Sequence, residues 1–221
     1  KYKIELLETS TVNKDSIINT IIRKNINVGF SFSCRNIIKG DFINALNRRI
    51  FNIHSAYLPS ERGGGLISYR IMNGINEVAA TIHLLDEGID TGNIILQKIK
   101  KLNTKRPYPK DYDYATTKLI CELLDSFIEM VERNDKFVTK KQVNNDSTYL
   151  PRLYTELNGA IDFSWSAKNI ERFIRAFGPF YPGAFTFLND KKIHIRRMQI
   201  KLSKIKYHPF LAGKILTVLD N

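Results

Sequence analysis

Short β-rich runs alternate with helical stretches along the first 134 residues of this sequence. Ile17, Ile18, Ile21 and Ile22 recur with a helical spacing, and a run rich in β-forming residues follows at 26–32. Such alternation predicts an α/β layer architecture with a mostly parallel sheet. We expect strands at 2–8, 26–32, 49–54, 78–85 and 93–101, and helices at 14–25, 39–48, 65–74 and 112–134.

The ends of these helices carry local signals. Asn13 or Asp15 is placed to cap the first helix, and Asp41 the second, because Asn and Asp side chains accept hydrogen bonds from free backbone amides. Gly74 follows the third helix, and glycine commonly ends helices because it adopts a left-handed backbone at little cost. These signals set the helix boundaries that we expect.

A different region follows Lys136, with a helix leading into short strands. This order predicts a first domain at 1–146. At 147–221 it predicts a linker, a helix and the start of a small, truncated, β-rich C-terminal domain. The expected elements are a polar loop at 141–154, a helix at 166–177 capped by Ser166, a hairpin at 184–200 turning near Asn189 and Asp190, and a strand at 213–220.

The net charge of +12 raises the question of a nucleic-acid partner. Lysines are spread along the chain, however, and no aromatic RNA-binding motif is present, so a compositional bias is the preferred explanation. No apolar run has the length of a membrane span, and no signal peptide is visible. Cys34 and Cys121 have no metal-like spacing, which indicates reduced thiols in a cytoplasmic protein without a metal site.

Polar side chains gather where two of the predicted strands end. The run 49–54 finishes with Asn52 and His54, and the acidic loop after the strand at 78–85 holds Asp86, Glu87 and Asp90. Ligands of parallel α/β sheets bind outside the carboxyl ends of the strands. A neutral His can accept a proton, a carboxylate can orient it, and an Asn amide can donate to a developing oxyanion. Together these residues favour acyl transfer to an amine.

The linked motifs over residues 30–97 resemble one known family. Asn-Ile-His at 52–54 is followed by Leu-Pro-x-x-Arg-Gly, by a helix ending in Asn-Gly, and by Thr-Ile-His-x-x-Asp-Glu-Gly-Ile-Asp-Thr-Gly at 81–92. This order closely resembles the 10-formyltetrahydrofolate-dependent formyltransferases, which act on methionyl-tRNA, glycinamide ribonucleotide or sugar nucleotides. Residues 162–185 resemble the junction between their catalytic and C-terminal domains. The resemblance implies a Rossmann-like catalytic domain.

The resemblance also implies a role for each candidate residue. Asn52, His54 and Asp90 match the three catalytic residues of the family. Asn52 would stabilise the oxyanion of a tetrahedral intermediate, His54 would move the proton released by the attacking amine, and Asp90 would orient and charge His54. The loop with Arg62, Gly63 and Gly64 would shape the side of the site that binds the acceptor amine.

The implied co-substrate is 10-formyltetrahydrofolate. In the family, backbone groups of two segments hold the pterin, and those segments correspond here to 30–38 and 84–90. Ile38 and Leu85 could equally belong to the hydrophobic core. The implied folate-binding residues are Arg35, Asn36, Ile38, Leu85, Glu87 and Gly88.

Residues 28–38 and 180–185 look closer to the sugar-nucleotide enzymes than to the tRNA enzymes. The expected acceptor is therefore an amino-deoxy sugar nucleotide, with a role in O-antigen or polysaccharide biosynthesis. Methionyl-tRNA as acceptor, hydrolysis with water, and folate binding without turnover stay as alternatives, and a homodimer is left open. Family members carry a further strand–helix–strand section before the segment that begins at Tyr2, so we expect the N-terminal part of the sheet to be missing from this sequence.

Overall fold

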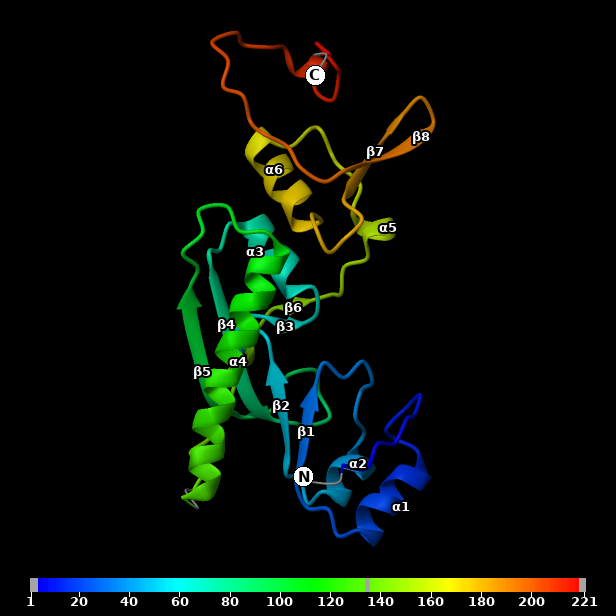
Figure 1. Cartoon of the computed structure of the whole chain (residues 1–221), viewed down its shortest axis with the longest axis vertical. Coiled ribbons are helices and arrows are strands. Elements are labelled where there is room, and N and C mark those ends of the chain that lie inside the picture. Colours follow the sequence, from blue (N-terminus) through cyan, green and yellow to red (C-terminus); the bar gives the residue numbers. More distant parts are fainter. Residues whose placement is uncertain (1–3, 134–135, 219–221) are drawn as a thin grey trace. The chain divides into compact units, whose positions relative to one another are not determined.

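The computed structural model describes residues 4–133 and 136–218 (Figure 1). Contacts divide the chain into two compact units, each assembled from three separate segments. The predicted boundary at residue 146 stays a prediction, since these units are interleaved along the chain. Unit 1 contains Lys1–Gly63, Val78–Lys100 and Thr116–Tyr149, and unit 2 contains Gly64–Glu77, Lys101–Ala115 and Leu150–Asn221.

A four-stranded sheet in the order β1-β2-β4-β5 forms the framework of unit 1. β1 and β2 are parallel, which confirms the predicted α/β architecture, but β2 and β4 are antiparallel, so the sheet is mixed. The connection after β2 delivers β4 at the end of the sheet where β2 finishes, which forces the two strands to run in opposite directions. The strands are β1 (Gly29–Phe32), β2 (Ile50–His54), β4 (Glu77–Leu84) and β5 (Ile94–Lys101).

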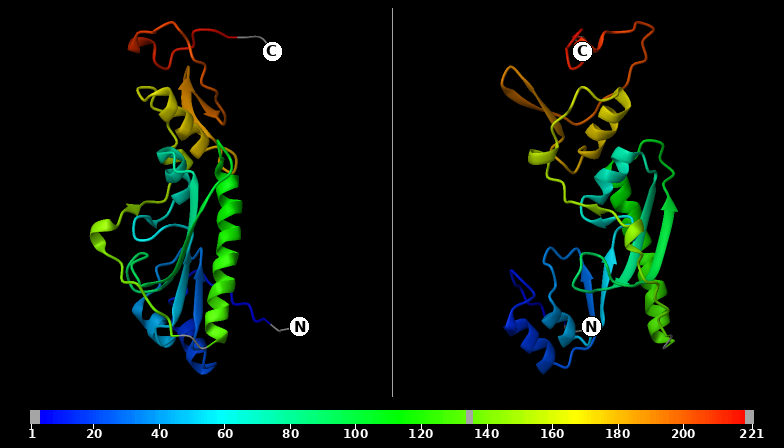
Figure 2. Two further views of the ribbon diagram at one scale, coloured as in Figure 1. Left: turned by 90° about the vertical axis from the view of Figure 1, so that its left-hand side faces the viewer. Right: turned by 180° about the vertical axis from the view of Figure 1, so that it is seen from behind.

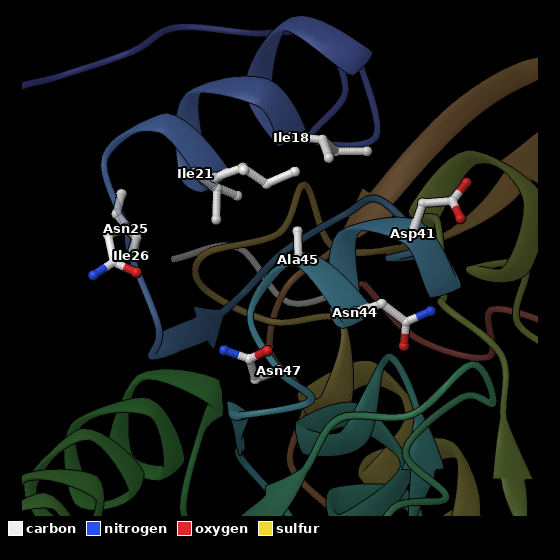
Figure 3. Close-up of a pocket in the computed structure, with 9 residues that line it drawn as sticks. Ile18, Ile21, Asn25, Ile26, Asp41, Asn44, Ala45 and Asn47 are labelled. Atoms are coloured by element: carbon white, nitrogen blue, oxygen red, sulfur yellow. The ribbon is translucent and has the colours of Figure 1, made fainter.

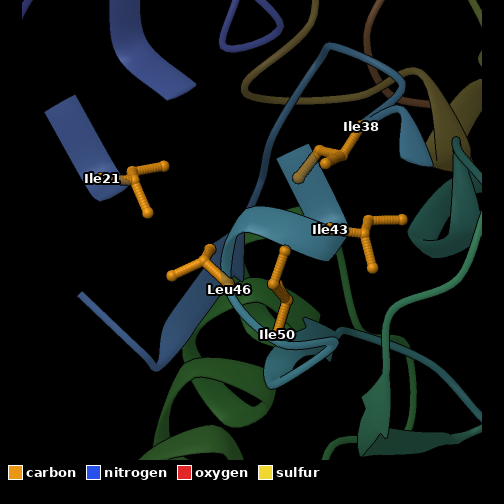
Figure 4. Close-up of a cluster of buried hydrophobic side chains, with 5 residues drawn as sticks. All are labelled: Ile21, Ile38, Ile43, Leu46 and Ile50. Carbon is orange, nitrogen blue, oxygen red and sulfur yellow. The ribbon is translucent and has the colours of Figure 1, made fainter. Parts of the chain in front are cut away.

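Helices α1 (Asp15–Arg23) and α2 (Gly40–Ala45) pack together near the N-terminal ends of β1 and β2 (Figure 2). Figure 4 shows the isoleucine-rich cluster that joins them to β2. Burying one such side chain fully stabilises the fold by roughly 1.5–3 kcal/mol. The buried members of the cluster are Ile21, Ile38, Ile43, Leu46 and Ile50, with Leu85 partly buried against them.

The long helix α4 (Pro109–Glu132) begins three residues before the predicted start. Its Phe127 packs edge-on against Phe51 of β2, with ring centroids 4.8 Å apart. Phe127 also stacks on Phe137, at a centroid distance of 5.2 Å. Residue 134, the predicted last residue of this helix, lies outside the described residues.

The caps predicted for α1 and α2 are wrong. For α1, part of the reason is that the Asn13 side chain makes its hydrogen bonds elsewhere. The residues preceding α1 and α2 are Lys14 and Lys39, and neither makes a side-chain cap. The Asn13 side chain instead accepts from the Lys39 amide at 2.8 Å and donates to the Ile37 carbonyl at 2.8 Å. Asp15 and Asp41 lie inside the first turns, where a negative charge interacts favourably with the positive end of the helix dipole.

Unit 2 confirms most of the predicted local structure. Ser166 caps α6 (Ala167–Ala176), and its Oγ accepts from the Asn169 amide at 3.3 Å. α3 (Leu66–Asn73) ends at Gly74, whose φ of 70° is left-handed. The hairpin of β7 (Ala184–Leu188) and β8 (Lys191–Ile195) turns at Asn189 and Asp190, both with positive φ. The short elements of the chain are β3 (Arg62–Gly63) and η1 (Asn144–Asp146) in unit 1, α5 (Thr155–Asn158) and η2 (Pro209–Leu211) in unit 2, and β6 (Tyr149–Leu150), which has one residue in each.

The two terminal strands predicted at 2–8 and 213–220 are wrong where they can be checked. Residues 4–8 and 213–218 have no strand structure, and the remaining positions of both predictions lie outside the described residues. Ile4 is 88% exposed and Val218 is 79% exposed. A β-rich run becomes a strand only where a neighbouring strand completes its hydrogen bonds.

Candidate active site

Four polar side chains of unit 1 meet at the end of β2. β2 supplies Asn52 and His54, β4 supplies His83, and the loop after β4 supplies Asp90. In the sheet register, Asn52 stands opposite His83. Asn52 Nδ2 lies 3.0 Å from His83 Nε2 and 3.3 Å from Asp90 Oδ1. The structure therefore brings the three predicted catalytic residues together and adds a histidine.

His83 belongs to the cluster although its role was not predicted. Its side chain is buried, and its Nδ1 lies 2.8 Å from the Leu84 carbonyl, an acceptor. Nδ1 therefore carries the proton, and Nε2 is left to accept from the Asn52 amide. Nε2 also lies 3.7 Å from Asp90 Oδ1. His83 lies within the motif at 81–92, but its place beside Asn52 follows only from the antiparallel register of β2 and β4.

His54 is held in the opposite tautomer. Its Nε2 lies 2.7 Å from the carbonyl of Glu61 and so must be the donor. Its Nδ1 faces Asp90 Oδ1 at 3.6 Å. Burial lowers the pKa of His54 more than the nearby charge of Asp90 raises it, with a smaller lowering from His83. The result is a neutral imidazole whose free nitrogen, Nδ1, can take up a proton beside a carboxylate.

Asp90 is anchored on both its side chain and its backbone. Its Oδ2 accepts from the Gly63 amide at 2.9 Å. Burial acts to raise the pKa of Asp90, but the nearby imidazoles of His83 and His54 and the Gly63 amide outweigh it and hold the pKa below its ordinary value. Its backbone has a φ of 54°, in the left-handed region that Asp tolerates better than most residues. Asp90 is therefore an ionised group in a fixed position.

The three residues of the loop predicted to bind the acceptor each have different hydrogen-bond partners. Gly63 donates to Asp90, as described above. Arg62 is buried, and its guanidinium donates to the side-chain oxygens of Gln142 and Asn144. Gly64 belongs to unit 2, where its amide donates to the Leu150 carbonyl at 2.7 Å. Acceptor binding by these residues stays a prediction.

The two segments predicted to bind folate lie next to each other in unit 1. Leu85 packs against the cluster that contains Ile38, so both side chains serve the core. A Cβ at Gly40 would lie 2.7 Å from Glu87 Oε1, which shows how closely the segments approach. Arg35, Glu87 and Gly88 are exposed and Asn36 is half-buried. Exposed polar groups therefore stand beside core side chains, and folate binding by these residues stays a prediction.

A cavity of about 460 Å³ lies between α1 and α2 and includes none of the four clustered residues (Figure 3). The cavity is lined by Ile18, Ile21, Ile22, Asn25, Ile26, Asp41, Asn44, Ala45 and Asn47.

Among the described residues, no group of three or more His, Cys, Asp or Glu side chains could hold a metal ion. Within the same residues, no helix is long and apolar enough to cross a membrane.

Comparison with known proteins gives matches over most of the chain. The formyl transferase family model matches residues 3–106, and the model of the formyl transferase C-terminal domain matches residues 155–221. The methionyl-tRNA formyltransferase of Rickettsia prowazekii (strain Madrid E) is 30% identical over 223 residues, which cover 100% of this chain and 69% of that relative. Other curated relatives are covered over as little as 31% of their length.

Two solved structures are similar at comparable identity. WlaRD, a sugar 3N-formyl transferase in the presence of dTDP and 5-N-formyl-THF, is 30% identical with a TM-score of 0.61, over 75% of this chain and 59% of that chain. The N-formyltransferase from Helicobacter canadensis in complex with folinic acid and dTDP-3-aminofucose is 31% identical with a TM-score of 0.58. That match covers 67% of this chain and 54% of that chain.

Proposed function

From the premise that the chain belongs to the 10-formyltetrahydrofolate-dependent formyltransferase family, we propose that it transfers a formyl group from 10-formyltetrahydrofolate to the amine of an amino-deoxy sugar nucleotide. The observation that carries the proposal is the cluster of Asn52, His54, His83 and Asp90. It places a neutral base 3.6 Å from an ionised carboxylate, and an amide donor 3.3 Å from the same carboxylate. These are the groups that acyl transfer to an amine requires.

In this proposal each residue of the cluster has a step in the chemistry. His54 Nδ1 takes the proton that the amine releases as its nitrogen bonds to the formyl carbon, and Asp90 beside it stabilises the resulting imidazolium. The imidazolium then returns the proton to N10 of the tetrahydrofolate as the bond between N10 and the formyl carbon breaks. Asn52 holds two acceptors through Nδ2, and the longer bond, to Asp90 at 3.3 Å, is the one that a developing oxyanion would replace. His83 keeps the Asn52 amide turned toward the site through the shorter bond.

The contact between the segments 30–38 and 84–90, through Ile38 and Leu85, supports folate binding next to this cluster. When bound, the folate supplies an activated formyl group as an electrophile. In this proposal Leu85 and Ile38 form the apolar floor of the folate site, and Arg35, Asn36, Glu87 and the backbone of Gly88 contact its polar edge. Two free cysteines, Cys34 and Cys121, fit the cytoplasmic location expected from the sequence.

The choice of a sugar nucleotide as acceptor is supported by two solved relatives. WlaRD was crystallised with dTDP, and the Helicobacter canadensis enzyme with dTDP-3-aminofucose, both at about 30% identity to this chain. By analogy with these proteins, the acceptor site would receive a nucleoside diphosphate sugar with a free amine. A role in polysaccharide biosynthesis follows as part of the same proposal.

Methionyl-tRNA is the second candidate acceptor, and the distribution of charge favours it. Between residues 189 and 218 the sequence has eight Lys or Arg residues and one acidic residue. The charge is thus more concentrated than the even spread described above. A dense basic segment is typical of a surface that binds phosphates of a nucleic acid. Several curated relatives are methionyl-tRNA formyltransferases.

An acceptor screen with 10-formyltetrahydrofolate tests the proposal. The acceptors are a set of dTDP- and UDP-linked amino sugars, a charged initiator tRNA, and buffer alone. We expect formylation of at least one sugar nucleotide. Formyl-methionyl-tRNA as the only product would contradict the sugar acceptor, folate release in buffer alone would indicate hydrolysis, and folate binding without any product would contradict formyl transfer itself.

A further inference from the structure

Gln142 makes four hydrogen bonds although no role was predicted for the polar loop that contains it. Its Nε2 donates to the carbonyls of Asp90 and Gly92 at 2.8 and 2.7 Å. Its Oε1 accepts from Nε and Nη2 of Arg62 at 3.1 and 2.9 Å. A carboxamide has two donor hydrogens and two acceptor lone pairs, so all are used. The buried amide is therefore fixed in one orientation.

The two carbonyls that Gln142 holds belong to a turn that needs outside support. Asp90 has a left-handed backbone, which is unfavourable for a residue with a side chain. At Gly92 a Cβ would lie 1.7 Å from the Leu84 carbonyl, so the turn runs against the end of β4. Gln142 supplies its two bonds from a segment 52 residues beyond Asp90.

Arg62 supports the amide from its other side. The guanidinium is buried and also donates to Asn144 Oδ1 at 3.3 Å, which fixes its plane. We propose that Gln142 is a positioning residue: it holds the turn so that the carboxylate of Asp90 faces His54, and Arg62 orients Gln142. The catalytic consequence rests on the proposed function, whereas the positioning is a property of the protein without ligands.

NMR of the unliganded protein tests the positioning directly. Gln142→Met keeps the length of the side chain and removes all four hydrogen bonds. Gln142→Asn keeps an amide but is one methylene too short to hold both carbonyls, and it serves if the first variant does not fold. The matched control is Asn76→Ala in unit 2, which also removes an amide that donates to two backbone carbonyls, those of Leu102 and Thr104.

We expect two changes in the Gln142 variants and neither in the control. The Gly63 amide proton should shift upfield as its bond to Asp90 is lost. The pKa of His54 should fall further, because the charge of Asp90 raises it in the wild type. Unchanged Gly63 and His54 signals in either folded Gln142 variant would overturn the proposal.

Kinetics then separate this inference from the proposed function. If the wild type is a formyltransferase, Gln142→Met should lower kcat by up to about 10²-fold with little change in KM, as expected for a misplaced catalytic group. A wild type that formylates no acceptor would contradict the proposed function alone, since the NMR result on Asp90 would still stand. A variant in which the Gly63 amide and His54 signals have changed but kcat is that of the wild type would show that this positioning of Asp90 does not affect catalysis.

Discussion

Two histidines of the candidate site are held in opposite tautomers, and each is fixed by a backbone carbonyl. Nε2 of His54 donates to the Glu61 carbonyl, and Nδ1 of His83 donates to the Leu84 carbonyl. The other ring nitrogens therefore have different neighbours: Nδ1 of His54 faces the carboxylate of Asp90, and Nε2 of His83 accepts from the amide of Asn52. In the proposed mechanism the two histidines accordingly have separate roles, His54 as the proton acceptor and His83 as a support for Asn52.

Replacing the base or the carboxylate should reduce formyl transfer without unfolding the protein. We predict that His54→Gln and Asp90→Asn each lower kcat by ~10²–10⁴-fold, the usual contribution of acid–base groups. Asn tolerates a positive φ, so Asp90→Asn leaves the backbone unstrained. Asp190→Asn is the matched control, since Asp190 has a φ of 63° and lies in unit 2. Wild-type rates in both site variants at saturating folate would remove these residues from the mechanism.

The protonation of His54 should be visible in the pH dependence of activity. Burial lowers its pKa below the ordinary 6.5, and only the neutral form can accept a proton. We predict that kcat/KM falls on the acid side with an apparent pKa below 6.5. A limb at or above 6.5, in buffers of constant ionic strength, would show that His54 is not the base observed.

The same group should couple stability to pH. Above pH 6.5 His54 is neutral in the folded and unfolded chain, so it adds no pH dependence there. Below 6.5 the unfolded chain binds the proton first, and the free energy of unfolding falls as the pH drops through the folded pKa. Urea unfolding at about pH 7.5 and about pH 5.5 should show a larger loss for the wild type than for His54→Asn. Equal losses would contradict a buried, neutral His54.

The site residues differ in how far the sequence could reveal them. Asn52, His54 and Asp90 stand at strand ends within a recognisable motif, and they do meet. His83 lies in the same motif, but recognising it required the antiparallel register of β2 and β4. Gln142 lies 80 residues from Arg62 and 52 from Asp90, in a segment without periodicity. Such a contact is set by the folded chain and leaves no local pattern.

At the scale of single elements, the sequence predicts the ends of helices and the turns of hairpins well, because their backbone hydrogen bonds are made by residues nearby in the chain. The Ser166 cap, the Gly74 stop and the Asn189–Asp190 turn all depend on backbone groups within a few residues. Direction within a sheet depends instead on distant neighbours. The antiparallel pairing of β4 and the unpaired runs at 4–8 and 213–218 show this difference.

The cap of α6 gives a prediction about an element. Ser166→Ala removes the side-chain acceptor for the Asn169 amide and should lower the free energy of unfolding by about 1 kcal/mol. The control is Ser126→Ala, whose Oγ donates only to the Glu122 carbonyl one turn back in α4. That change should stay within about 0.5 kcal/mol of the wild type. Equal effects of the two substitutions in urea unfolding would contradict the capping role.

For the whole molecule, the basic segment at 189–218 suggests a test that distinguishes the two candidate acceptors by how their binding depends on salt. A sugar nucleotide offers few phosphates, so its binding depends little on salt. For tRNA, the logarithm of the binding constant falls with the logarithm of the salt concentration, with a slope of about 0.7–0.9 per phosphate contact. We predict sugar-nucleotide turnover that survives about 150 mM salt and tRNA binding that is weak there. The comparison needs one competition assay over a series of salt concentrations. Tight tRNA binding at that salt, with no sugar product, would reverse the choice of acceptor.

A control for that assay comes from how the lysines are paired. Replacing Lys201, Lys204 and Lys206 with Gln should reduce the salt slope of any tRNA binding, because these side chains are exposed. Lys98 and Lys100 both pair with Glu122, at 3.0 and 2.9 Å, so the same replacement there should change the slope little. Equal effects at both places would mean that only the net charge matters.

The interleaving of the two units bears on how the protein is made. Segments 64–77 and 101–115 leave the ribosome well before Leu150–Asn221, the rest of unit 2. Ser68, for example, donates to the carbonyl of Ala176, 108 residues later. Domains generally fold as units during synthesis, so unit 2 must wait until the last third of the chain has emerged. Until then α3 lacks α6, the helix against which it packs in the finished protein.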